Sequence, residues 1–129
     1  MENDGLRKAL RYRWAIFGVL SGGYVLVYFH RLCPAVLAVD MMQDLKTGGT
    51  LTGLLSAAYF YPYALMQLPA GLLSDSWGPR RTITIFFGVA FAGSVLLGYA
   101  SSAIWAVAGR TLVGIGVAML FVPTMKILA

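Results

Sequence analysis

Two arginines stand inside long apolar stretches of this sequence. Arg31 interrupts the run 14–38, and Arg110 lies six residues into a run that begins at Ile104. A charged side chain at the centre of a membrane-spanning helix costs about 2.5–3.5 kcal/mol on insertion scales, so it faces protein or a water-filled cavity. Each guanidinium is therefore a candidate for binding an anionic group or for coupling charge movement to function.

The residues around Arg31 favour a binding role. Tyr24, Tyr28 and Arg31 follow one another at i, i+4 and i+7, which places them on one face of a helix. Two phenols and a guanidinium on one stripe predict the polar lining of a cavity, and we assign Tyr28 and Arg31 to solute binding. The alternative is that Arg31 snorkels, because it lies seven residues, or about 10 Å, from Ala38 and its long stem could reach the membrane interface.

Arg31 and Arg110 are expected at similar depths on helices of opposite direction. Two like charges at one height in a medium of low dielectric constant repel each other unless an anion, a carboxylate or water lies between them. The four long apolar runs contain no aspartate or glutamate. The countercharge must come from a solute, from solvent or from helices outside this chain, and the first of these predicts a small anionic organic solute as ligand.

His30 directly precedes Arg31. An imidazole titrates near neutral pH, so His30 could take up and release a proton. The alternative for His30 is a neutral, hydrogen-bonded side chain within the helix packing.

A second polar stripe lies in the run 51–73. It consists of Ser56, Tyr59, Tyr63 and Gln67, at i, i+3, i+7 and i+11. Such an aromatic stripe is common in helix packing, but the amide of Gln67 close to Tyr63 favours the lining of a cavity. We therefore assign Tyr63 and Gln67 to solute binding.

The composition indicates the kind of fold that positions these residues. Hydrophobic residues make up 59% of the 129 positions and charged residues 12%, whereas a soluble domain has about 45–50% and about 25%. A helix needs about 20 apolar residues to cross a bilayer. We predict an all-α integral membrane protein with four antiparallel transmembrane helices after a basic segment 1–13, the spans being 14–38, 51–73, 82–99 and 104–128.

The same features argue against other classes of protein. The single cysteine, Cys33, and the single histidine exclude a disulfide framework within the chain and a Cys/His metal cluster, so we expect no metal and no cofactor. The runs are too long and do not alternate as β-barrel strands do. The first run is followed by further spans and by no A-x-A site, which disfavours a signal peptide. The net charge of +5 fits a lipid bilayer as partner better than nucleic acid.

The basic residues predict the orientation, because lysines and arginines concentrate on the cytoplasmic side. One side of the predicted bundle has only Lys46, and the other has Arg7, Lys8, Arg11, Arg13, Arg80, Arg81 and Lys126. We therefore place the N-terminus and the loop 74–81 in the cytoplasm. We expect the chain to be a multi-pass protein of the plasma membrane, such as a bacterial inner membrane.

Small residues within the runs predict close helix packing. Gly18 and Gly22 are spaced as small-xxx-small, and Gly114 and Gly116 lie together in the last run. Such residues let the backbones of two helices approach each other.

The segment 71–81 combines a carboxylate with a turn. Asp75 falls at the C-terminal end of a predicted helix, where the helix dipole disfavours a negative charge, so it should seek an arginine or the N-terminus of another helix. Gly78 and Pro79 predict a tight turn. Arg80 and Arg81 follow it, where anionic headgroups attract them.

This segment resembles the signature loop of the major facilitator superfamily, Gly-x-x-x-Asp-(Arg/Lys)-x-Gly-x-(Arg/Lys)-(Arg/Lys). Gly71, Asp75, Gly78, Arg80 and Arg81 match it, while Ser76 stands where the family usually has a basic residue. The helix 110–118, with Arg110, Gly114, Gly116 and Ala118, is similar to a second family motif. The stretch 28–31 is similar to one found in organic-anion and sugar-phosphate permeases, some of which have an acidic residue at the position of His30.

The resemblance implies a secondary active transporter, such as a symporter, with twelve helices in two halves that rock around a central cavity. This chain would be a truncated N-terminal fragment of it, and the missing C-terminal helices would be its partner. Asp75 would hold the cytoplasmic gate closed against a helix of the second half. The alternative function is a small, self-contained four-helix membrane protein, such as a dimeric exporter or an assembly factor. An enzyme is disfavoured, because the sequence has no Ser/His/Asp set, HExxH or phosphate-binding loop.

Overall fold

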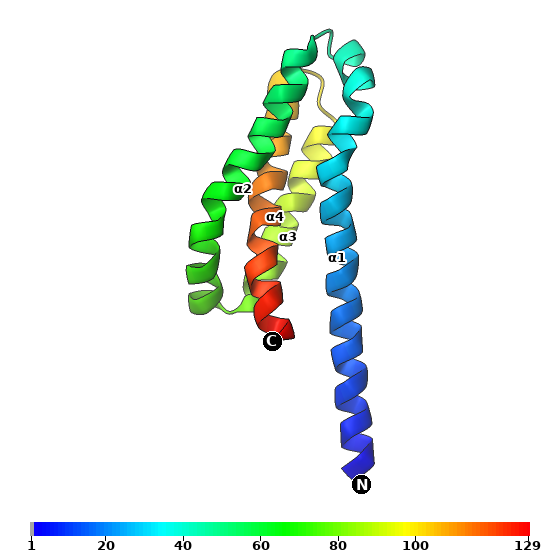
Figure 1. Ribbon diagram of the computed structural model, residues 1–129, viewed down its shortest axis with the longest axis vertical. Helices are drawn as coiled ribbons and strands as arrows, with labels where there is room; N and C mark the ends of the chain where they lie inside the picture. Colours follow the sequence, from blue (N-terminus) through cyan, green and yellow to red (C-terminus); the bar gives the residue numbers. More distant parts are fainter. Residues whose placement is uncertain (1) are drawn as a thin grey trace.

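The computed structural model describes residues 2–129, apart from the side chains at positions 2, 3 and 34. All elements in this part of the chain are α-helices: α1 (Glu2–Asp44), α2 (Gly49–Trp77), α3 (Pro79–Gly98) and α4 (Ala103–Leu128). The chain reverses its direction at each short connection (Figure 1). The start of α1, the α2–α3 connection and the end of α4 share one end of the molecule, here called the basic end, and the other two connections form the loop end.

The predicted all-helical fold is confirmed for the described residues, but the helices are longer than the apolar runs. The helix α1 begins at Glu2 and ends at Asp44, whereas the apolar run covers only 14–38. At the N-terminal end, glutamate, lysine and arginine continue the helix, because they are good helix formers even where they cannot lie in lipid. At the C-terminal end, methionine and glutamine do the same. The limits of the membrane-embedded segments stay predictions.

Three helices have the length and apolar composition of a membrane span: 4–33 within α1, α3 and α4. The helix α2 falls outside this group although it is long enough, because its tyrosines, prolines and Gln67 reduce its hydropathy. A span that lines a polar cavity is expected to have this composition, since its inner face does not touch lipid.

The α2–α3 connection depends on one glycine. The backbone φ angle of Gly78 is 84°, a value that residues with a Cβ rarely adopt. Pro79 follows as the first residue of α3, where its fixed φ fits the helix and its missing N–H costs no hydrogen bond. The predicted tight turn at Gly78 and Pro79 is therefore present.

The helix α4 lies at the centre of the packing and approaches both neighbours closely through glycines. A Cβ at Gly114 would come within 2.6 Å of the Tyr59 carbonyl oxygen on α2. A Cβ at Gly116 would come within 2.6 Å of the Ala90 nitrogen on α3, and one at Gly109 within 2.7 Å of the Leu97 nitrogen. The close packing predicted for Gly114 and Gly116 is confirmed.

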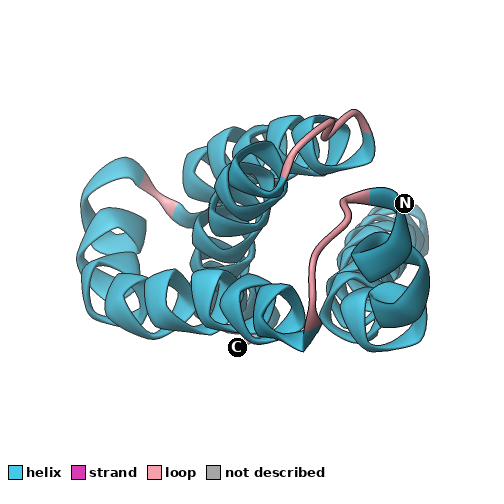
Figure 2. Ribbon diagram, turned by 90° about the horizontal axis from the view of Figure 1, so that it is seen from above, coloured by secondary structure: helices cyan, strands magenta, loops and turns pink. Residues whose placement is uncertain are grey.

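The corresponding prediction for Gly18 and Gly22 is wrong for the described residues, because a Cβ at either position would meet nothing within 4 Å. Both glycines lie on α1, which packs least against the others and stands at one side of the bundle (Figure 2). Most of its large apolar side chains are exposed, whereas twelve residues of α4 are buried.

Candidate functional site

Arg110 is buried where α1, α2 and α4 meet. Its side chain is 2% exposed. The Nη1 group donates a hydrogen bond of 2.5 Å to the backbone oxygen of His30 on α1. The guanidinium carbon lies 4.4 Å from the centroid of the Tyr59 ring on α2, within cation–π range. Arg110 thus joins three helices through polar contacts.

Arg31 has a different environment at the same level of the bundle. Its side chain is exposed, and its guanidinium carbon lies 5.2 Å from the centroid of the Phe60 ring. Among the described residues, no hydrogen bond or ion pair engages it. Because Tyr59 and Phe60 are neighbours in α2, the two guanidinium groups lie at one level along that helix.

A cavity of about 140 Å³ opens beside Arg31, and we call it the Arg31 pocket. Its polar lining comes from two predicted stripes, since Tyr28 and Arg31 of α1 meet Tyr63 of α2 there. Apolar side chains of α4 close the pocket. The full lining is Tyr24, Val27, Tyr28, Arg31, Tyr63, Val117, Leu120 and Phe121.

Packing holds Tyr63 of this pocket in place, and the Tyr24 hydroxyl is left without a partner in the described chain. Tyr63 stacks on Tyr59 with ring centroids 6.0 Å apart and planes inclined by 13°. The Tyr24 hydroxyl oxygen is buried without a hydrogen-bond partner in the described part of the chain. A guanidinium and three phenols can together bind an anionic group by charge and orient it by hydrogen bonds. Gln67, the fourth predicted binding residue, is half-buried one turn beyond Tyr63 and does not line this pocket.

His30 faces away from Arg31, toward α3. Its Nε2 atom lies 3.0 Å from the Ser94 hydroxyl oxygen, and Ser94 donates its own hydrogen to the Ala90 carbonyl at 2.8 Å. A hydroxyl has one hydrogen to give, so Nε2 of His30 is the donor in this contact. His30 therefore has the hydrogen bond that the packing alternative requires, while it also lines a cavity with Arg110.

That second cavity, here called the Arg110 cavity, has a volume of about 340 Å³ and extends toward the loop end. All four helices or their connections contribute to it. Its polar lining comes from His30, Cys33, Ser94, Arg110 and Asp44.

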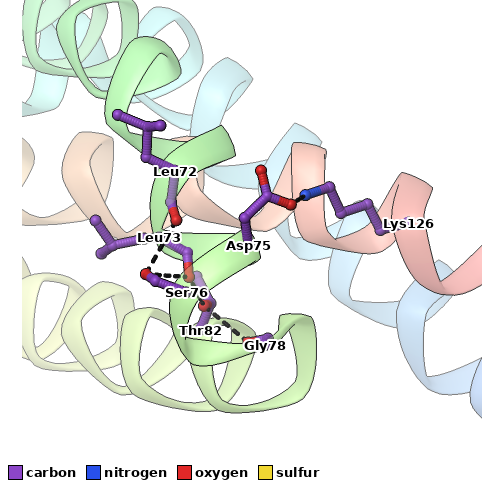
Figure 3. Close-up of polar contacts among 7 residues, drawn as sticks. All are labelled: Leu72, Leu73, Asp75, Ser76, Gly78, Thr82 and Lys126. Atoms are coloured by element: carbon purple, nitrogen blue, oxygen red, sulfur yellow. Dashed lines mark hydrogen bonds and ion pairs between the residues drawn. The ribbon is translucent and has the colours of Figure 1, made fainter.

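Asp75 forms an ion pair with Lys126 in the last turn of α4 (Figure 3). The sequence predicted an arginine or a helix N-terminus as its partner, and the structure corrects this to a lysine. Both side chains are accessible to solvent, Asp75 being 71% and Lys126 37% exposed. The pair fastens the end of α2 to the end of α4 at the basic end.

The hydroxyl groups of the loop bond to its own backbone (Figure 3). Ser76, at the position where the resemblance implies a basic residue, donates to the Leu72 oxygen at 3.0 Å. Thr82 is buried and donates to the Gly78 oxygen at 3.0 Å, which closes the first turn of α3. Arg80 and Arg81 are exposed and point to no carboxylate in the described chain, and Gly71 has open space around it.

Sequence reasoning missed three contacts of this site. Tyr59 was placed in a stripe but not recognised as the platform of Arg110, and Lys126 was not recognised as the partner of Asp75. Ser94 was not considered, although it is one of few hydroxyl residues in the run 82–99 and could have been noticed as such.

The chain matches the family model described as Major Facilitator Superfamily over residues 20–129. It is 29% identical, over 86% of its length, to a Cupriavidus necator protein named "Probable sulfoacetate transporter SauU". It is 28% identical over 98% of its length to an uncharacterized transporter of Bacillus subtilis. It is 29% identical over 84% of its length to an Arabidopsis thaliana protein named "Probable anion transporter 6, chloroplastic".

The chain covers 26%, 29% and 21% of the lengths of these three relatives. No solved structure matches it.

Proposed function

This chain belongs to the major facilitator superfamily, and from that premise we propose that it provides the first four membrane spans of a secondary transporter for a small organic anion. The family and the apolar helices make it a multi-pass membrane protein. The proposal adds that α2 is the fourth span, antiparallel to its neighbours. The complete transporter has twelve helices and works by alternating access.

The Arg31 pocket is the observation that carries the proposal. It brings one guanidinium and three phenols from two helices into one cavity, and Arg31 has no protein partner that would neutralise it among the described residues. In this proposal Arg31 binds the anionic group, and Tyr28 and Tyr63 orient it. Gln67, one turn along α2, contacts the part of the solute that extends beyond the pocket.

Two relatives support an anionic solute, because their names describe a sulfoacetate transporter and an anion transporter. The composition of the pocket points to the same chemistry, since a fixed guanidinium matches carboxylate and sulfonate groups in charge and in hydrogen-bond donors.

The remaining predicted residues have roles in coupling and switching. We propose that His30 and Arg110 couple solute movement to a co-transported ion. The loop 71–81 acts as the conformational switch, with Asp75 exchanging Lys126 for a helix of the second half when the cytoplasmic gate closes. The basic end faces the cytoplasm, so the N-terminus and the α2–α3 connection lie inside a cell such as a bacterium.

Uptake by the complete protein in proteoliposomes tests the proposal. Solutes are offered as matched pairs that differ only in charge, such as a carboxylate or sulfonate and its amide. We expect uptake of the anionic member of a pair, its loss in Arg31→Ala and its partial retention in Arg31→Lys. Equal uptake of neutral members, or full uptake by Arg31→Ala, would show that Arg31 does not bind an anionic solute.

A further inference from the structure

The Arg110 cavity contains a buried cation that the Arg31 pocket does not use. Arg110 is 2% exposed, and its Nε atom is buried without a hydrogen-bond acceptor in the described chain. A guanidinium keeps its charge in proteins. A buried charge is costly unless a countercharge and hydrogen bonds compensate it.

The protein groups around Arg110 supply hydrogen bonds but no nearby countercharge. Its described contacts are the His30 carbonyl and the face of Tyr59, both uncharged. The carboxylate in the cavity lining belongs to Asp44. That residue lies 14 positions after His30 on the same helix, which corresponds to about 21 Å, so it stands near the mouth and not beside Arg110.

We propose that the Arg110 cavity is a second anion site, separate from the Arg31 pocket, for a compact monovalent oxyanion such as a carboxylate or sulfonate. Its volume of about 340 Å³ is in the range of small-molecule sites. Arg110 supplies the charge, and Ser94 with His30 forms the polar wall. Apolar side chains of α1, α2 and α3 form most of the remaining wall. The site adds anion binding to the coupling role proposed for His30 and Arg110, and its test does not require transport.

Cys33 makes this site measurable. It lies one turn after His30, is half-buried and lines the same cavity. Two impermeant methanethiosulfonates, one with a sulfonatoethyl and one with a trimethylammonioethyl group, transfer their thioalkyl group to a cysteine thiolate and release methanesulfinate. The rates are measured in proteoliposomes of the complete protein, with any cysteine beyond residue 129 replaced by serine.

The reagents are added from the loop-end side, and the labelling ratio is the rate with the anionic reagent divided by the rate with the cationic one. We expect this ratio to be at least about tenfold higher at Cys33 than at an exposed reference thiol, since local charge alters such rates by 10-fold or more. The reference is Ser101→Cys with Cys33→Ser, in the α3–α4 connection. Arg110→Gln should lower the ratio to the reference value, and Arg110→Lys should preserve it. Acetate should slow labelling of Cys33 in the unaltered chain, and acetamide should not.

The acetate test needs no substitution at Arg110, so it decides the matter even if Arg110→Gln does not fold. An unreactive Cys33 would mean that other parts of the protein fill the cavity, and this overturns the proposal. So would a ratio equal to the reference, or labelling that acetate does not slow. Arg31→Ala should abolish transport and leave the labelling ratio unchanged, which separates this site from the proposed function.

Discussion

The helices α1 and α4 both carry an arginine inside an apolar run, yet Arg31 of α1 is exposed and Arg110 of α4 is buried. Half of the residues in the most apolar stretch of α4 are buried. None of the residues in the most apolar stretch of α1 is buried. Arg110 on α4 contacts two other helices, while Arg31 on α1 is exposed beside a pocket. The comparison shows that a similar sequence context does not give a similar environment. The arginine on the packed helix contacts two other helices inside the bundle, and the arginine on the open helix is exposed beside its pocket.

The aromatic residues beneath the two arginines should differ most in their effect on stability. Tyr59 is 1% exposed and Phe60 is 44% exposed. Tyr59→Ala should lower the free energy of unfolding by about 3–5 kcal/mol, as for other buried aromatic residues, and Phe60→Ala by about 0.5 kcal/mol. Unfolding of the complete protein in SDS titrations measures both. Equal losses for the two variants would mean that α2 does not distinguish the two arginines.

A smaller contrast is expected between glycines of the two helices. Gly114→Ala places a methyl group against the Tyr59 backbone and should cost about 1–3 kcal/mol, because a backbone cannot move aside without separating the helices. Gly22→Ala has open space and should gain about 0.5–1 kcal/mol from helix propensity. Thermal unfolding of the two variants in one detergent compares them. A Gly22→Ala variant that is less stable than the unaltered chain would show that α1 is packed as tightly as α4.

The smallest effect is expected at the basic end. The pair of Asp75 and Lys126 is solvent-exposed, and such pairs contribute about 0.2–1 kcal/mol. A double-mutant cycle with Asp75→Asn and Lys126→Gln should give a coupling energy in this range, which decreases as salt is added. A coupling energy near zero at low salt would place the partner of Asp75 elsewhere.

The sequence predicted those features that depend on the local residue pattern. Long apolar runs give helices, Gly78 with Pro79 gives the turn, and Gly114 with Gly116 gives the close packing of α4. The i, i+4, i+7 stripe also placed Tyr28 and Arg31 on one surface that lines one pocket.

Features that depend on neighbours in space could not be predicted in this way. The partner of Asp75 lies 51 residues away, and that of His30 lies 64 residues away. Tyr59 and Tyr63 belong to one sequence stripe, but the packing of α4 buries the first and leaves the second at a pocket. Gly18 and Gly22 have the spacing of a packing motif, yet no helix of the described chain approaches them. Whether helices meet depends on tertiary packing, which a spacing alone does not determine.

Equilibrium binding of the transported anion to the purified complete protein tests the central claim most directly. Arg31→Gln should raise Kd by roughly 30-fold or more, which corresponds to about 2 kcal/mol for the loss of hydrogen bonds to a charged group. Arg31→Lys should weaken binding less, and Arg13→Gln, which removes an exposed charge from the same helix, should leave Kd unchanged. An unchanged Kd in Arg31→Gln would contradict the assignment of the anion to the Arg31 pocket.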